Sequence, residues 1–178
     1  MTLALELDPR ELASIQVALN ERPEQAGRAL VRAINKTLTW AVSQGLRAIA
    51  SANDVPLKAL RGRRRGRKRN ASRRNQVGTA WFGILPVRAS DVGTPRQSRL
   101  GARAGKHFFS GAFVATMPSG HIGIFKRRTQ SRLPIIEQVV RLQSAETVIE
   151  GVARETSTRL ETVFAQEFNY EINVRGQA

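Results

Sequence analysis

The residues best suited to chemistry in this chain are a dense run of arginines and lysines. From Lys58 to Arg74, ten of the 17 residues are basic and none is acidic. Guanidinium groups bind phosphate oxygens through paired hydrogen bonds, and each neutralised phosphate of a nucleic acid releases a counterion. The residues expected to contact such a polyanion are Arg61, Arg63, Arg64, Arg65, Arg67, Lys68, Arg69, Arg73 and Arg74.

Three interpretations of this run remain open. We favour a nucleic acid as its partner, bound through the sugar-phosphate backbone without reading sequence, because no recognition helix is apparent. No aromatic residue interrupts the run, so stacking of single-stranded bases has no local support. The second interpretation is an acidic protein surface as the partner, which would bind the same basic side chains. The third interpretation is a solvated loop that only aids solubility.

Catalytic and metal-binding patterns are missing from the sequence. His107 and His121 are the only histidines, they stand 14 positions apart, and there is no cysteine. A zinc site needs more ligands than these two residues and their neighbours supply. No phosphate-binding loop, dinucleotide fingerprint or nucleophile elbow is present. The sequence therefore predicts no catalytic residue, no metal, no cofactor and no enzymatic activity.

Composition predicts a soluble protein of one domain, residues 1–178. The chain has 29 basic and 14 acidic residues, a net charge of +15, and 41% hydrophobic residues, which is enough for a core. Residues 55–136 hold 19 of the basic residues and one acid, Asp91. No apolar run approaches a membrane span, the first residues do not resemble a signal peptide, and the lack of cysteine fits synthesis in the cytoplasm.

The helices and strands expected to position the basic run are typical of an α+β fold. Helices are expected from Asp8-Pro9 to Leu19, from Arg22 to about Asn53 and over about 143–168, with one further helical turn at 56–60. The expected extended segments are 2–7, 77–87, a hairpin of 108–117 with 122–126, 133–136, and an edge strand over 169–175. We expect a small antiparallel sheet packed against two long helices, a mobile basic loop at 61–76 and a Gly/Arg-rich excursion at 88–107.

Several stretches resemble the minor tail protein Z family of lambda-like tailed phages. The likeness is densest in His107–Met117 (HFFSGAFVATM), Ser119–Arg127 (SGHIGIFKR) and Arg132–Ile135 (RLPI). The shorter stretches Arg32–Thr37, Pro56–Leu60 and Trp81–Gly83 are also similar, so the likeness covers roughly residues 26–165. The dense arginine run at 61–74 departs from the family pattern.

The resemblance implies a structural virion protein, assembled in the host cytoplasm, that completes the tail at its head-proximal end. It implies a homo-oligomeric ring, commonly sixfold, with the tail terminator, the tail tube and the head-tail connector as partners. It also implies an α+β fold and transfers no catalytic residue. Joined to the charge pattern, it suggests that the basic loop meets phage DNA or an acidic patch on a neck protein. The alternative is a stand-alone, non-specific nucleic-acid-binding protein.

Overall fold

The computed structural model of the protein describes residues 2–7, 13–61 and 66–175. Their contacts divide into two compact units. The first comprises residues 1–47, 62–83 and 146–178, and the second comprises residues 48–61 and 84–145. The single domain expected from the chain length stays a prediction. None of the helices in the described part of the chain is long and apolar enough to cross a bilayer.

Three α-helices contribute to the first unit: α1 (Ala13–Glu21), α2 (Pro23–Ala52) and α5 (Ala145–Tyr170). Pro23 opens α2, where its fixed φ angle suits the first helical turn and its missing N–H is not needed. Glu24 follows in that turn and complements the positive end of the helix dipole. The long helix expected from Arg22 to Asn53 is therefore confirmed. Residues 8–12, where the first helix was expected to begin, lie outside the described residues.

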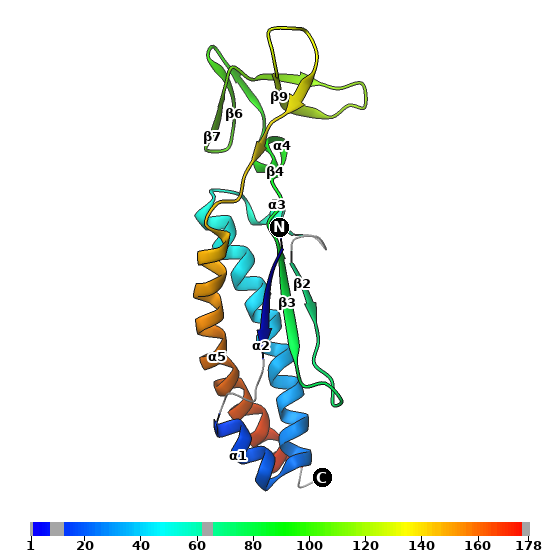
Figure 1. The fold of residues 1–178 in the computed structure, drawn as a ribbon, viewed down its shortest axis with the longest axis vertical. Helices are drawn as coiled ribbons and strands as arrows, with labels where there is room; N and C mark the ends of the chain where they lie inside the picture. The colour runs from blue at the N-terminus through cyan, green and yellow to red at the C-terminus, as the bar shows by residue number, and fades with distance from the viewer. Residues whose placement is uncertain (1, 8–12, 62–65, 176–178) are drawn as a thin grey trace. The chain divides into compact units, whose positions relative to one another are not determined.

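Helices α2 and α5 run side by side in opposite directions (Figure 1). Their contacts show this directly, because Arg28 meets Glu171, whereas Trp40, further along α2, meets Arg159, which is earlier in α5. Small side chains line the buried face of α2, with Ala26, Ala29 and Ala33 fully buried. Alanines allow two helix backbones to approach closely, so this pair forms the core of the first unit.

A three-stranded antiparallel sheet packs on α2. Its order is β1 (Thr2–Leu7), β3 (Gly78–Gly83) and β2 (Gly66–Arg69), so β3 is central and β2 is an edge. Glycines bring the sheet close to the helix. A Cβ on Gly78 would stand 2.5 Å from Leu38 Cδ1, and one on Gly66 would stand 3.0 Å from Leu46 Cδ1. Phe82, fully buried in β3, fills the corresponding space beside Gly45 of α2.

The second unit is mostly β-structure. Its short helices are α3 (Leu57–Leu60) and α4 (Ala89–Val92). Its strands are β4 (Val87–Arg88), β5 (Arg96–Ser98), β6 (Gly101–Ala104), β7 (His107–Ser110), β8 (Phe113–Thr116), β9 (Ile122–Arg127), β10 (Ile135–Glu137) and β11 (Val139–Val140). They form three small sheets, ordered β10-β9-β8, β11-β4 and β5-β6-β7. The sheets enclose a cluster built mainly from alanines, with Ile124 as its large member.

The structure confirms the expected α+β fold class but corrects four other expectations from the sequence. Residues 66–69 form strand β2 and are not part of a loop. Residues 88–107 contain α4, β5 and β6 and are not an irregular excursion. Residues 108–117 are divided between two sheets, because Gly111, at φ 65°, turns the chain, and only β8 pairs with β9. Residues 171–175 continue α5 as a π-helical turn and are not an edge strand.

Candidate polyanion interface

The described part of the basic run is an edge strand with two chemically different faces. Because side chains alternate along a strand, Lys68 shares the α2-facing side with Gly66, whereas Arg67 and Arg69 lie on the other side. The strand pairs with β3 in a register that sets Lys68 opposite Ala80 and Arg69 opposite Thr79. Charged side chains are usual on edge strands because they stay solvated while the backbone pairs.

Two hydroxyl groups orient basic side chains on this strand. Lys68 Nζ donates to Thr39 Oγ1 on α2 at 2.6 Å, and Arg69 Nη2 donates to Thr79 Oγ1 at 3.4 Å. Neither hydroxyl carries a charge, so both hydrogen bonds place a cation without neutralising it. Arg67, Lys68 and Arg69 are all exposed.

The turn that joins β2 to β3 presents two more arginines. Ser72 N donates to Asn75 O at 2.7 Å, and Asn75 N donates to Ser72 Oγ at 3.2 Å. Arg73 and Arg74 stand between these two residues and are exposed at the tip of the hairpin. Two hydrogen bonds between Ser72 and Asn75 therefore close the turn that carries these adjacent cations.

Asn35 of α2 fixes this turn to the helix. Its Nδ2 donates to Ala71 O at 3.2 Å, and its Oδ1 accepts from Ala71 N at 2.9 Å. Ala71 is buried, so both of its backbone groups need a partner within the protein. The Asn35 side chain thus satisfies both backbone hydrogen-bonding groups of Ala71. It holds the basic hairpin, which we define as residues 66–77, on the helical scaffold.

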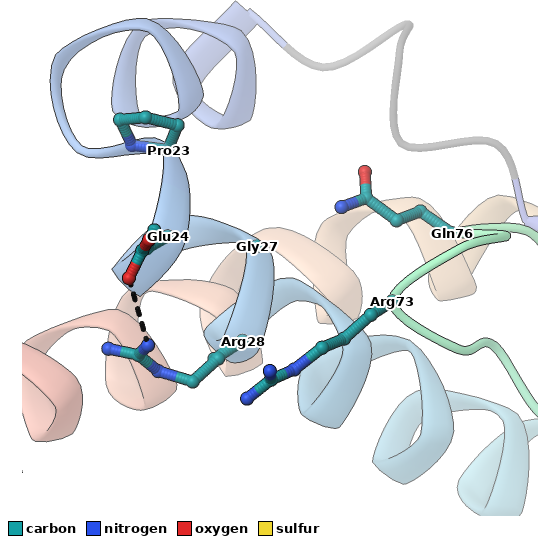
Figure 2. Close-up of a pocket in the computed structure, with 6 residues that line it drawn as sticks. All are labelled: Pro23, Glu24, Gly27, Arg28, Arg73 and Gln76. Atoms are coloured by element: carbon teal, nitrogen blue, oxygen red, sulfur yellow. Dashed lines mark ion pairs between the residues drawn. The ribbon is translucent and has the colours of Figure 1, made fainter.

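A shallow depression lies where the hairpin tip meets the first turns of α2. It is lined by Pro23, Glu24, Gly27, Arg28, Arg73 and Gln76. Figure 2 shows Arg73 extending from the hairpin across this depression toward the helical turn that bears Arg28, which is paired with Glu24. Arg28 also binds Glu171 at 2.8 Å, so its charge is offset from two sides, and Arg73 lies beside an already neutralised arginine.

The cations of α2 are neutralised by a cluster at the end of α5. Arg32 Nε binds Glu167 Oε2 at 2.6 Å, its Nη1 binds Glu171 Oε1 at 2.5 Å, and Lys36 Nζ also pairs with Glu167. The Glu171 side chain has 0% of its surface exposed. Burial alone would raise the pKa of Glu171, but hydrogen bonds from Arg28 and Arg32 outweigh it and lower that pKa to about 2. The pKa of Glu167 is also lowered, because hydrogen bonds from Arg32 and Lys36 outweigh the effect of its burial.

The cluster neutralises cations of α2, whereas the positive charges of the basic hairpin have no acidic partner in the described part of the chain. Among the described residues, Arg67, Lys68, Arg69, Arg73 and Arg74 form no ion pair. The remaining predicted contact residues stay a prediction. Arg61 follows α3 in the second unit, and Arg63, Arg64 and Arg65 lie outside the described residues.

The two histidines have local partners. His107 Nε2 lies 3.1 Å from Asn53 O, and His121 Nε2 lies 2.7 Å from Glu137 Oε1. Within residues 2–7, 13–61 and 66–175, no group of three or more histidine or acidic side chains is placed to hold a metal ion.

The comparisons with known proteins decide the family. The family model of the prophage minor tail protein Z matches residues 14–176, nearly the whole chain. The chain belongs to the prophage minor tail protein Z family. No curated protein and no solved structure matches it. Membership assigns a structural role in a phage tail and makes the protein a virion component.

Within this minor tail protein, sequence reasoning missed the residues that hold the hairpin and cancel the neighbouring charge. Glu167 and Glu171 continue the buried stripe of α5 beyond Leu160 and Val163, at the spacing of successive turns. Arg28, Arg32 and Lys36 repeat every four residues on α2. These two matching periodicities are the signal that could have revealed the cluster. Asn35 carries no comparable signal, because its partner is backbone.

Proposed function

We propose that this member of the minor tail protein Z family completes the phage tail at its head-proximal end. Several copies form a ring, which helps to join the tail to the head, and the basic hairpin contacts the DNA that reaches this neck. One observation carries the proposal: Arg67, Lys68, Arg69, Arg73 and Arg74 are exposed and unpaired on a hairpin that α2 holds in place. The partners are the tail terminator, the tail tube and the head-tail connector.

The geometry of β2 suits a phosphate backbone. Arg67 and Arg69 share one face, so they are separated by two residue steps, about 6.7 Å along the strand. This equals roughly the axial rise of two nucleotides in one DNA strand, at about 3.4 Å each. Backbone contacts of this kind carry no sequence preference, which is what a neck protein needs for whichever DNA end it meets.

A ring multiplies this charge. Each copy has a formal net charge of +15, and closed symmetry repeats the same surface at every subunit. A sixfold ring would concentrate cations around the path of the DNA. Their summed electrostatic potential would attract the DNA before it contacts any one subunit. Sixfold symmetry and the position of the hairpin at the lumen or at a ring edge are both part of the proposal.

The decisive experiment compares two sets of charge removals in the phage. The test variant is R67Q/R69Q/R73Q/R74Q. The control removes four exposed arginines of the second unit that form no ion pair among the described residues, R96Q/R99Q/R128Q/R132Q. We expect the test particles to show unjoined heads and tails or a displaced DNA end on electron microscopy, while the control particles stay intact. Normal joining and a normally seated DNA end in the test particles would contradict the proposal.

Binding to duplex DNA separates the remaining alternatives. For the purified protein, the test variant should flatten the dependence of log Kd on log salt by about one unit for each phosphate contact removed. Unchanged DNA binding together with failed joining would identify an acidic neck protein as the polyanion. A stand-alone nucleic-acid-binding protein would instead bind duplex tightly as a free chain and leave particle assembly unaffected when mutated.

A further inference from the structure

A second surface of interest lies wholly within the second unit and does not involve the basic hairpin. It is an open groove of about 410 Å³, which falls within the size range of protein ligand sites. Its walls come from β7 and from β11 with the residues that follow it, and the turn after α2 closes one side. The lining residues are Ala52, Asn53, Asp54, His107, Phe108, Phe109, Val139, Val140, Arg141, Gln143 and Ser144.

The lining shows that the groove lies along strand edges. Three consecutive residues of β7, His107 to Phe109, line it, and so do Val139, Val140 and Arg141. Consecutive side chains of a strand point to opposite faces, so a groove that touches three in a row meets the strand edge-on. Among the described residues, β7 pairs only with β6, and β11 pairs only with β4. Both strands therefore have an unpaired edge.

The backbone of β7 offers hydrogen-bonding groups at this edge. The carbonyl of Phe109 points toward β6, because it lies 2.2 Å from the place where a Cβ on Gly101 would stand. Successive peptide groups of a strand point in opposite directions, so the N–H and C=O of Phe108 are directed away from β6. An extended segment placed alongside β7 would pair with them, as in strand addition to other open sheets.

Apolar side chains flank this edge and are incompletely covered. Phe108 is 45% exposed and Val139 is 41% exposed, one on each wall of the groove. An added strand with apolar side chains at alternate positions would cover both residues and remove their apolar surface from water, which favours binding.

The groove is preformed, because Asn53 forms hydrogen bonds with two of the segments around it. Asn53 Nδ2 donates to Ile49 O at 2.9 Å and to Gln143 O at 3.1 Å, and its Oδ1 accepts from Gln143 N at 2.6 Å. These bonds join the end of α2 to the wall that carries Val139 and Arg141. A preformed site loses less conformational entropy when its partner binds.

Charge indicates the chemistry of the occupant. The second unit, all of which is described, has 12 basic residues and three acids, Asp54, Asp91 and Glu137. Asp54 is paired with Lys106 at 2.5 Å, and the Lys106 hydrogen bond lowers its pKa. Arg141 lines the groove, is exposed and has no ion pair among the described residues. An acidic segment complements this surface, whereas a basic one is repelled.

We propose that this groove binds an extended, acidic segment of another protein, which adds to the open edge of β7 and covers Phe108 and Val139 with alternating apolar side chains. Such a contact would give the tail protein a docking point separate from the basic hairpin.

The test uses the full chain and a labelled eight-residue peptide of alternating glutamate and valine, with both ends blocked. Fluorescence anisotropy should show saturable binding. Methylation of alternate backbone nitrogens of the peptide should weaken Kd at least tenfold, because it removes strand pairing. A peptide with lysine in place of glutamate should bind at least tenfold more weakly. Hydrogen exchange of the 107–110 segment should slow only with the unmodified acidic peptide.

Matched variants locate the site. F108S and R141Q should each weaken binding about fivefold or more, whereas L100S should leave it unchanged, because Leu100 is 73% exposed in the β5–β6 turn and does not line the groove. R67Q/R69Q/R73Q/R74Q should also leave it unchanged, so this test is independent of DNA binding. Equal affinity for the methylated or the lysine peptide, or no binding, would overturn the proposal. A dimer that F108S converts to a monomer would also overturn it, by identifying a second copy as the occupant.

Discussion

Asn35 on α2 and Ala71 in the β2–β3 turn are joined by a reciprocal pair of hydrogen bonds, 3.2 Å and 2.9 Å long, between a side-chain amide and both backbone groups of one residue. This contact positions a segment in which five described basic residues stand without an acidic partner. Its consequence is that a chain segment with little apolar content of its own takes a defined place on a helical scaffold.

Removing the Asn35 carboxamide should release the hairpin tip. We expect N35A to lower the free energy of unfolding by about 1–3 kcal/mol, because the buried N–H and C=O of Ala71 lose their partners. Hydrogen exchange over residues 70–76 should accelerate. N20A, which alters an exposed asparagine of α1, is the control and should change neither quantity. Equal protection of the tip in N35A and in the original chain would show that the strand pairing alone holds the hairpin.

Glu171 should make the protein acid-sensitive. Its pKa in the folded protein is about 2, below its ordinary 4.5, so its stabilising effect is complete above pH 4.5 and is lost as the pH falls toward 2. E171Q should lower the free energy of unfolding at pH 7 by about 3 kcal/mol, because Arg28 and Arg32 lose a buried partner.

The same variant should also lose less further stability than the original chain between pH 4.5 and pH 2, since it has no carboxylate to protonate. Urea unfolding at several pH values measures both effects. E161Q, at an exposed position of α5, is the control and should change stability by less than about 0.5 kcal/mol. Parallel pH curves for E171Q and the original chain would contradict this role of Glu171.

Two glycine-to-alanine changes should act in opposite directions. In G78A the new methyl group would meet Leu38 Cδ1 at 2.5 Å and Ile34 Cγ2 at 2.6 Å, so either these two side chains or strand β3 must shift. We expect a loss of about 1–3 kcal/mol. G151A, in the middle of α5, meets nothing within 4 Å and should gain about 0.5–1 kcal/mol from its higher helix propensity. Thermal unfolding of the two variants measures the contrast.

Two buried threonines should respond differently to replacement by valine. Thr37 is fully buried, and within the described residues its Oγ1 has no hydrogen-bond partner, so T37V should stabilise the protein by about 1 kcal/mol. Thr156 is equally buried but donates to Val152 O at 2.6 Å, so T156V should be neutral or destabilising. Denaturant unfolding of both variants checks this, and equal effects would show that the Thr37 hydroxyl is satisfied in solution.

Local patterns in the sequence determined the main helices, strand β1 and one β-turn. The 3.6-residue spacing of apolar positions defined α2 and α5, the alternating leucines defined β1, and Pro-Ser-Gly-His marked the β8–β9 turn. These elements follow from short-range rules: periodicity, turn residues and helix-capping chemistry. The density of arginine in residues 61–74 and the resemblance to a phage tail family were likewise visible without coordinates, and the family match confirms the latter.

Only the tertiary structure decided which charges are free. From the sequence, Arg28, Arg32 and Lys36 look as available as Arg67 or Arg73, but α5 brings Glu167 and Glu171 against the first three from more than 130 positions away. The same holds for strand β2, which pairs with β3 because glycines let both strands lie against α2. These ion pairs join segments remote in sequence, and the place of β2 depends on the packing of its sheet against α2. Local composition predicts a basic surface, but the fold alone determines where its charge is left unpaired.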